Sequence, residues 1–311
     1  MSWILIALVA YLLLATSNLF DKFLVDNVLP SSKAYAFIAG LGGALLLIGA
    51  PWFLNWPGLY WFIINILTGC VFAVALWLLY EALRRGEASQ TVVLVGGLTP
   101  VFSITFSILF FKEQYSSLEW AGIITLLVGI FIIALLPRHR HFFSRIMSKL
   151  NINQNIKTGS LIFAAGSALA YATYFVATKY AYSAQSFGSV FIWNRLGALL
   201  FVLIFLIRPS DRKQVLSVFK KSNHSKHKSL VLISQTVGSA GFLLQSYAVF
   251  LGSVALVNAL QGAQYAFLLI ASSILAVLSP KLLKETFSWR IFLQKLVAVI
   301  VIAFGLYFIM A

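Results

Sequence analysis

Long apolar runs, separated by short polar segments, form the main pattern of the chain. The runs are continuous, whereas a transmembrane β-strand would alternate apolar and polar side chains over about 9–11 residues. A bilayer core of about 30 Å needs roughly 20 apolar residues in a helix, and every backbone group must be satisfied within the lipid. Ten runs fit a transmembrane helix: residues 3–25, 34–51, 59–82, 89–111, 118–136, 158–181, 187–207, 229–251, 254–279 and 290–310. The pattern therefore predicts an all-α integral membrane protein with ten transmembrane helices.

The pattern of polar and small residues in the first five runs returns in the last five. Lys112-Glu113 follows the fourth run, and Lys284-Glu285 follows the ninth. The segment ATSNLFDK in the first run aligns with ATYFVATK in the sixth. Because five helices are an odd number, the second copy must cross the membrane in the opposite direction, as in an inverted repeat. We therefore expect a first five-helix repeat at residues 1–137, a basic cytoplasmic linker at 138–157 and a second five-helix repeat at 158–311.

Composition agrees with a membrane protein. Apolar residues make up 61% of the 311 residues, charged residues make up 10%, and the mean hydropathy is +0.93. A soluble domain is usually about 45–50% apolar and about 25% charged, so the bilayer must be the solvent for most of this surface. Lys and Arg total 23 against 8 acidic residues, which gives a net charge of +15. The basic loops lack a folded platform for reading nucleic acid, so we expect them at anionic lipid headgroups and expect no nucleic-acid partner.

The basic residues lie mainly in alternate connections. The connections between spans one and two, three and four, five and six, seven and eight, and nine and ten hold most of them, whereas the opposite connections hold little beyond Lys112 and Lys179. Positively charged loops stay preferentially in the cytoplasm. We therefore expect both termini outside, in a multi-pass protein of the prokaryotic cytoplasmic (inner) membrane.

Two basic connections combine apolar and basic residues at helical spacing. One covers residues 142–150, and the other covers residues 213–221, where Val215, Leu216 and Phe219 lie among lysines. Short helices lying on the lipid headgroups would produce this pattern. A solvated basic linker is the alternative in both places.

The segment YEALRRGEASQTVVLVGGLTPVF, followed by KE and by WAGIITLLVGIFII, resembles the EamA type of the drug/metabolite transporter superfamily. The segment YAVFLGSVALVNALQGAQYAF, followed by KE and by AFGLYFI, is similar to a second copy of that unit. The resemblance implies the EamA fold, with ten helices in two inverted halves, and secondary transport of small metabolites, often export. Members of the family commonly have both termini in the cytoplasm, which is the opposite of what the charge pattern predicts here.

Charged groups inside the apolar runs are the first candidates for function, because they are expensive in lipid. Asp21 and Lys22 lie near the end of the first run, and Lys179 is the repeat-mate of Lys22. These groups are either polar anchors at the rim of a central cavity or, for the lysines, chains that reach the interface. Arg195 lies deep in the seventh run, and its donors require either an acid such as Asp21 or Glu81 or an anionic substrate group.

Asp21 and Glu81 are the two acidic residues that we expect within the lipid core. A proton-coupled cycle needs a group that changes its charge, so both are candidates for proton coupling. Glu81 precedes Arg84 and Arg85 by about one helical turn, and a simple ion pair at the rim is the alternative for it.

The ninth run has a polar but uncharged face. At about 100° per residue, Asn258, Gln261, Gln264 and Tyr265 fall within a sector of roughly 120°. Buried amides need partners, so this face either lines a cavity or bonds to other helices. We expect a substrate site between the two halves formed by Asp21, Lys22, Lys179, Arg195, Gln245, Asn258, Gln261, Gln264 and Tyr265.

A carrier is the functional class that these features favour. We expect a secondary transporter, monomeric or homodimeric and without a cofactor, that moves a small polar metabolite such as an amino acid by alternating access. The cations Lys22, Lys179 and Arg195 also suit the alternative of a phosphorylated or nucleotide-linked anion. An enzyme is not expected, since Cys70 has no evident helper and the four His residues lie in loops among like charges that would also repel a metal. A non-transporting assembly subunit is the alternative from another class.

Overall fold

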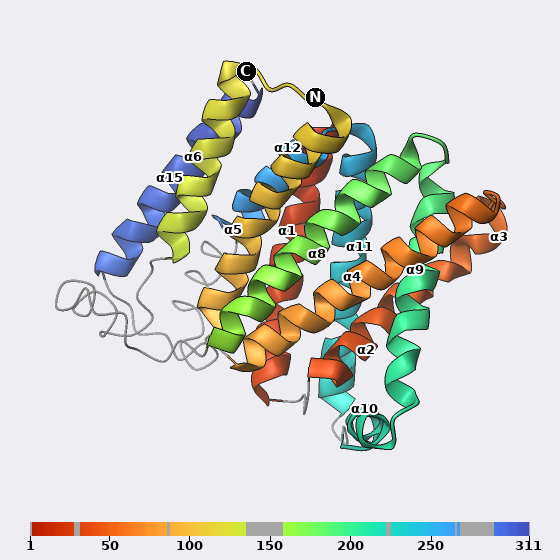
Figure 1. Cartoon of the computed structure of the whole chain (residues 1–311). Helices are drawn as coiled ribbons and strands as arrows, with labels where there is room; N and C mark the ends of the chain where they lie inside the picture. The colour runs from red at the N-terminus through yellow and green to blue at the C-terminus, as the bar shows by residue number, and fades with distance from the viewer. Residues whose placement is uncertain are drawn as a thin grey trace.

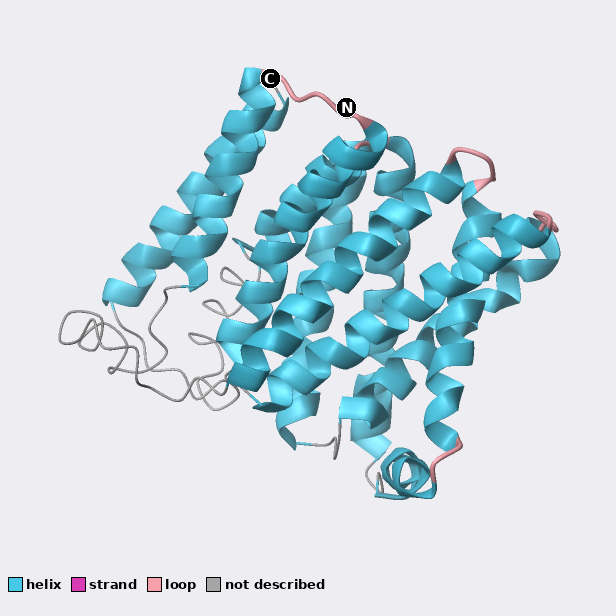
Figure 2. Cartoon of the chain, viewed as in Figure 1, coloured by secondary structure: helices cyan, strands magenta, loops and turns pink. Residues whose placement is uncertain are grey.

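The computed structural model describes residues 2–27, 32–85, 88–134, 158–221, 225–264, 266–267 and 289–310. All regular secondary structure within these ranges is helical (Figure 1, Figure 2). Long continuous apolar runs satisfy their backbone groups in lipid as helices. The predicted all-α fold is therefore confirmed.

The helices follow the predicted runs closely. In chain order they are α1 (Ser2–Asn27), α2 (Ser32–Ala44), η1 (Leu45–Gly49), α3 (Ala50–Phe53), α4 (Leu59–Arg85), α5 (Ala88–Phe106), η2 (Ser107–Phe111), α6 (Ser117–Ala134), α8 (Thr158–Tyr182), α9 (Phe187–Leu203), η3 (Ile204–Leu206), α10 (Pro209–Lys221), α11 (Ser225–Leu251), α12 (Val254–Ala259) and α15 (Trp289–Met310). Each of the ten predicted spans overlaps at least one of these helices. The part of the ninth predicted span after residue 267 lies outside the described residues.

Several of the described helical segments are long and apolar enough to cross a membrane. They are Ser32–Phe53, Leu59–Ala82, Leu94–Phe111, Ser160–Tyr182 and Phe187–Leu206. Many large apolar side chains on the outside of the bundle are exposed, and Trp52 and Ile207 are 75% and 77% exposed. A surface of this kind requires lipid around it. The chain is therefore an integral, multi-pass membrane protein, as predicted.

Helices of one half pack against helices of the other. α1 lies along α11, and α4 lies along α8. α1 and α8 are the first spans of their halves, and α4 and α11 are the third. The predicted repeat therefore makes these two contacts equivalent, since each joins the first span of one half to the third span of the other. The fifth helices, α6 and α15, lie against each other. In Figure 1, α1 starts at the end of the bundle where both termini lie, whereas α8 starts at the opposite end, as an inverted repeat requires.

Two glycines bring α4 and α9 into backbone contact. A Cβ on Gly69 would lie 2.1 Å from the carbonyl oxygen of Asn194, and a Cβ on Gly197 would lie 2.3 Å from that of Ile66. Helices in lipid gain little from apolar burial, so close backbone approach at small residues is a main source of their packing energy. This contact holds α9, which carries Arg195, against α4.

The predicted amphipathic segment at residues 213–221 lies within a helix, α10. Figure 1 views α10 nearly along its own axis, so this helix runs across the bundle at the end opposite the termini. Asp211 and Val215 are buried, and Lys33 of α2 donates to Asp211 Oδ2 at 2.7 Å. This ion pair connects the second helix of the first half to α10. The other amphipathic connection, at residues 142–150, lies outside the described residues.

Candidate substrate site

Arg195 lies in the middle of α9 and is only 6% exposed. Its guanidinium carbon lies 4.3 Å from the ring centroid of Phe242, 4.5 Å from that of Phe72 and 4.9 Å from that of Phe191. These rings belong to α11, α4 and α9, so both halves surround the cation. Gly43 of α2 leaves room on another side, because a Cβ there would lie 3.2 Å from Arg195 Nη1. Ring faces attract a cation most strongly where water is excluded.

The guanidinium of Arg195 has unused donors. Its Nε and Nη2 atoms are buried without a hydrogen-bond partner among the described residues. Tyr174 and Tyr182 interact electrostatically with the guanidinium, and the Tyr174 hydroxyl also lies near enough for a weak hydrogen bond to it, although neither hydroxyl has a partner at ordinary hydrogen-bonding geometry among the described residues. Of the two acids expected to face Arg195, Glu81 bonds to other residues, and the side chain of Asp21 lies outside the described residues. A buried charge without a partner is unfavourable as a structural element and is typical of a binding site.

Asn258 connects the two halves near the start of the ninth span. It is fully buried in α12, and its Nδ2 donates to Ser103 Oγ of α5 at 2.8 Å. Its Oδ1 atom is buried without a partner in the described part of the chain. One side of this amide therefore bonds between helices, and the other side is left for a further group. Gln264 is also buried, Gln261 is half-buried, and Tyr265 lies outside the described residues.

Tyr11 of α1 joins the eighth and ninth spans. Its hydroxyl donates to the carbonyl oxygen of Val257 at 2.6 Å and accepts from Gln245 Nε2 at 3.4 Å. The ninth span is interrupted beside this contact, because α12 ends at Ala259 and Leu260 forms a turn. Interrupted helices whose backbone bonds to side chains are a common feature of substrate sites in transporters with inverted repeats.

Lys179 holds the end of α11. Its Nζ donates to the carbonyl oxygens of Val249 and Phe250 at 3.0 Å each and to that of Gly252 at 2.7 Å. The last carbonyls of a helix have no partner within the helix, and a cation there also interacts favourably with the helix dipole. All three ammonium protons are therefore engaged by backbone. These contacts favour a structural role, while the predicted role of Lys179 in substrate binding stays a prediction.

Glu113 forms a second connection at the same end of the bundle. Ser253, the residue before α12, donates to Glu113 Oε2 at 2.6 Å, and Tyr115 donates to the same oxygen. Ser253 Oγ also accepts from the backbone nitrogen of Leu256, so it caps α12. Burial and the hydrogen bond to Glu113 raise the pKa of the Tyr115 hydroxyl. The loop between α5 and α6 is thereby fastened to the turn between α11 and α12.

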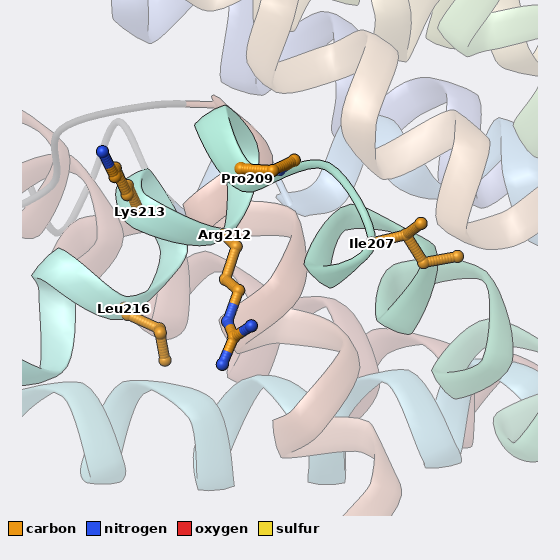
Figure 3. Close-up of a pocket in the computed structure, with 5 residues that line it drawn as sticks. All are labelled: Ile207, Pro209, Arg212, Lys213 and Leu216. Atoms are coloured by element: carbon orange, nitrogen blue, oxygen red, sulfur yellow. The ribbon is translucent and has the colours of Figure 1, made fainter.

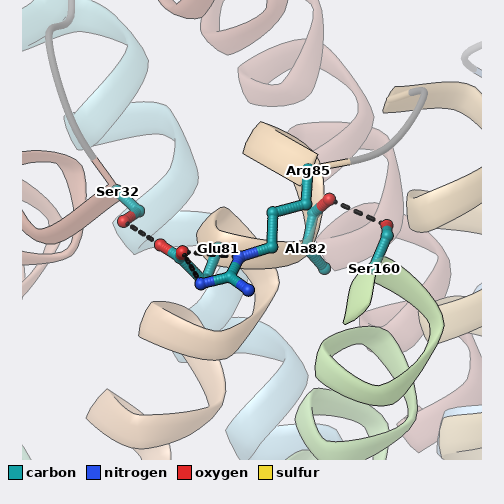
Figure 4. A network of polar contacts seen from close by, with 5 residues as sticks. All are labelled: Ser32, Glu81, Ala82, Arg85 and Ser160. Carbon is teal, nitrogen blue, oxygen red and sulfur yellow. Dashed lines mark hydrogen bonds and ion pairs between the residues drawn. The ribbon is translucent and has the colours of Figure 1, made fainter. Parts of the chain in front are cut away.

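Glu81, a predicted proton-coupling candidate, lies at the opposite end. Figure 4 shows its carboxylate between Ser32, which donates to it at 2.6 Å, and Arg85, whose Nε donates to it at 2.8 Å. The ion pair with Arg85, which the sequence offered as the alternative, is present in the structure. Nearby, Ser160 donates to the carbonyl oxygen of Ala82 at 3.0 Å and joins α8 to α4 (Figure 4).

Two pockets lie near this end of the molecule. One, of about 370 Å³, is lined by Ser32, Lys33, Trp77, Glu81, Arg84, Arg85, Phe163, Asp211 and Gln214. Two of its basic side chains, Lys33 and Arg85, pair with its acidic ones, Asp211 and Glu81, and Arg84 adds one further positive charge. The other, of about 280 Å³, lies against α10 and is lined by Ile207, Pro209, Arg212, Lys213 and Leu216 (Figure 3).

Sequence reasoning missed several groups that surround the predicted residues. Phe72 and Phe242 gave no signal, because aromatic residues occur throughout the chain and nothing in one sequence shows which of them face a cation. Ser103 and Tyr11 were missed because several polar side chains occur in each of these runs, and one sequence does not show which of them bond to other helices. The side chains of Asp21 and Lys22 lie outside the described residues, so their place relative to Arg195 stays a prediction.

Comparisons with known proteins give a family match in the first half and a fold match over the whole chain. Residues 1–135 match the EamA-like transporter family. A solved structure described only as "Crystal structure of protein" has a TM-score of 0.69 and 20% sequence identity, over 99% of this chain and 96% of its own. The search of curated proteins gives no match. At 20% identity the structural likeness shows the fold alone, and it extends over both halves.

Proposed function

We propose, on the premise that residues 1–135 match the EamA-like transporter family, that the chain is a secondary transporter that moves a small polar metabolite by alternating access. EamA-type proteins are transporters. Export of the metabolite, and residence in the inner membrane of a prokaryote as a monomer or homodimer, complete the proposal. No enzymatic activity is part of it.

The observation that carries the proposal is the buried Arg195 between the two halves. Its Nε and Nη2 atoms lack partners among the described residues, and the aromatic rings around it come from α4, α9 and α11. The orphan Oδ1 atom of Asn258 adds an acceptor at a second contact between halves. Unpaired polar atoms at such a contact favour a transported solute over the alternative of a sealed assembly subunit, whose buried amides would bond fully to neighbouring helices.

Connections between the halves at both ends of the bundle support alternating access. At one end Lys33 of the first half pairs with Asp211 of the second, and at the other end Glu113 of the first half accepts from Ser253 of the second. These polar contacts lie at the two ends of the bundle, and between them the halves are joined by the long contacts of α1 with α11 and of α4 with α8. In the proposed cycle the contacts at one end break while those at the other end hold, which is the motion that inverted repeats perform.

The surface of α10 supports the expected contact with anionic lipid. Arg212 and Lys213 are exposed beside the apolar side chains of Ile207 and Leu216, and the four residues line one pocket (Figure 3). A basic helix that lies across a bundle end and exposes apolar side chains beside its cations is suited to the headgroup region.

Efflux from proteoliposomes tests the proposed function on many candidate substrates at once. Purified protein is reconstituted into vesicles loaded with a metabolite extract of the host cell, and released compounds are identified by mass spectrometry. We expect one class of small polar compounds to leave faster than from protein-free vesicles. If no compound in the extract moves faster with the protein present, the chain is an assembly subunit and the proposal is wrong.

A glutamine pair tests the participation of the ninth span. Gln261→Ala should lower the rate of efflux without loss of folded protein, because helical spacing predicts Gln261 on a polar face with Asn258 and Gln264. Gln114→Ala, at an exposed position in the loop after α5, is the matched control and should keep the original rate. Equal rates for the two variants would remove Gln261 from the site.

A further inference from the structure

We propose that Arg195 binds the carboxylate of the transported metabolite, so that the substrate is a small monocarboxylate with an apolar group beside the acid rather than a phosphorylated compound. This inference rests on the proposed transport function and names its substrate class. Three features of the site support it: the unpaired donors of Arg195, the aromatic rings around its guanidinium, and the number of described cations that could balance the charge of a bound anion.

The free donors of Arg195 match a carboxylate in number and direction. Nε and Nη2 carry the two parallel N–H groups on one side of a guanidinium, and both are buried without a partner in the described part of the chain. A carboxylate accepts such a pair through its two oxygens, in the bidentate arrangement that arginine favours. Nη1 lies on the side of Gly43, away from that edge.

The surroundings of the guanidinium are aromatic. The rings of Phe72 and Phe242 have centroids 4.8 Å apart, and the ring of Tyr174 lies 5.0 Å from that of Phe72. An apolar group attached to the carboxylate would contact these rings, whereas a second hydrophilic group there would lose its water without compensation. Gln245 lies one turn beyond Phe242 on α11, and its Nε2 donates to the Tyr11 hydroxyl.

The cations that the structure describes around this site argue against a phosphate. A phosphate monoester carries about −1.5 to −2 charges near neutral pH and needs more than one cation when it is buried. Lys179, the second cation predicted for such a substrate, gives all its donors to the end of α11. Within the described residues Arg195 therefore offers one positive charge, which balances one carboxylate.

Ligand-dependent thermal unfolding of the full-length protein in detergent tests this assignment. The probes are butyrate, L-leucine and L-phenylalanine, each compared with its amide, together with glycerol 3-phosphate. We expect at least one carboxylate to raise the unfolding midpoint, and we expect its amide and the phosphate ester to have no effect. Stabilisation by glycerol 3-phosphate alone, or equal stabilisation by an acid and its amide, would overturn the assignment.

Variants at Arg195 provide the second readout. Arg195→Gln should weaken binding of the effective carboxylate by about 10- to 100-fold, because hydrogen bonds to a charged group contribute about 1.5–3 kcal/mol. Without ligand, the same change removes both a buried charge and its contacts with the rings of Phe72, Phe191 and Phe242, so the affinity for the carboxylate, and not the midpoint of the free protein, is the deciding measurement. Arg195→Lys should lose the bidentate geometry but retain part of the affinity, and Arg208→Gln, at an exposed position, should behave as the original protein.

A structural role for Arg195 predicts the opposite result. If the arginine has only a structural role, Arg195→Gln will leave carboxylate binding intact, and the assignment is wrong. Phe242→Leu keeps an apolar side chain but removes the ring, and should weaken carboxylate binding several-fold even if the Arg195 variants fail to fold. Efflux from loaded vesicles distinguishes the proposed transport function from the proposed carboxylate site. If the protein transports only compounds without a carboxylate, the carboxylate site is wrong and the transport function is still supported.

Discussion

Replacing Lys179 with methionine tests whether this lysine holds the end of α11 or binds substrate. In the structure its Nζ donates to backbone carbonyl oxygens at 2.7, 3.0 and 3.0 Å. An ammonium group has three protons to donate, so none is left for another acceptor. Methionine keeps a long, unbranched side chain and removes every donor, so the substitution isolates the contribution of these bonds.

The expected loss follows from the contacts. A hydrogen bond to a charged group contributes about 1.5–3 kcal/mol, and a cation at a partly buried helix end contributes up to about 2 kcal/mol. The three bonds share one charge, and in the variant water at the end of the span can bond to some of the freed carbonyl oxygens. The total free energy lost is therefore well below that of three separate bonds. We therefore expect Lys179→Met to lower the free energy of unfolding by about 3 kcal/mol. In a chain of this size, that loss lowers the unfolding midpoint by roughly 6 °C.

The assay is thermal unfolding of the purified protein in detergent, followed by tryptophan fluorescence. Lys179→Arg keeps the charge and several donors and should lose less than the methionine variant. Lys213→Met, at an exposed lysine of α10, is the matched control and should shift the midpoint by no more than about 1 °C. A midpoint for Lys179→Met equal to that of the control would refute the reasoning and would favour Lys179 as a substrate ligand.

Three further predictions concern packing, coupling and orientation. Gly69→Ala should destabilise the protein by more than about 3 kcal/mol, measured by thermal unfolding, because its Cβ would lie 2.1 Å from a carbonyl oxygen of α9. Gly166→Ala is the control, since the nearest atom to its Cβ would be 3.5 Å away. Asp21→Asn should abolish the pH dependence of transport in proteoliposomes if the cycle uses protons, and an unchanged pH profile would exclude that role. Cysteines placed at positions 2 and 311 of a cysteine-free protein should react with an impermeant reagent from outside the cell, and reaction only after permeabilisation would reverse the predicted orientation.

The sequence alone determined the solvent, the kind of secondary structure and the number of expected spans. Run length and continuous apolar character are local properties, and the bilayer leaves few structures that satisfy the backbone. The odd number of spans per copy then set the relative direction of the halves, and Figure 1 shows the first helices of the halves starting at opposite ends. The amphipathic spacing around Val215 likewise indicated α10, because helical periodicity is a local property too.

Partners of the polar groups were decided only by the tertiary structure. Lys179 and Lys22 occupy matching positions in the repeat, yet no local pattern places the ammonium group of Lys179 on carbonyls 70 to 73 residues away. Glu81 was expected to face Arg195 or Arg85, and the rotation of α4 directs it to Arg85 and Ser32. Helix rotation and crossing distance select among such partners, and both depend on contacts between distant segments.

Arg195 shows the same division most clearly. Its depth in an apolar run marked it as a functional residue, since a charge in lipid is expensive wherever the run is placed. Its free Nε and Nη2 atoms and its aromatic neighbours depend on how α4, α9 and α11 meet, and Gly69 and Gly197 set part of that meeting. The sequence therefore identified Arg195 as a candidate. Only the packing of α4, α9 and α11 decided its surroundings: among the described residues, its guanidinium faces aromatic rings, and its Nε and Nη2 atoms have no acidic partner.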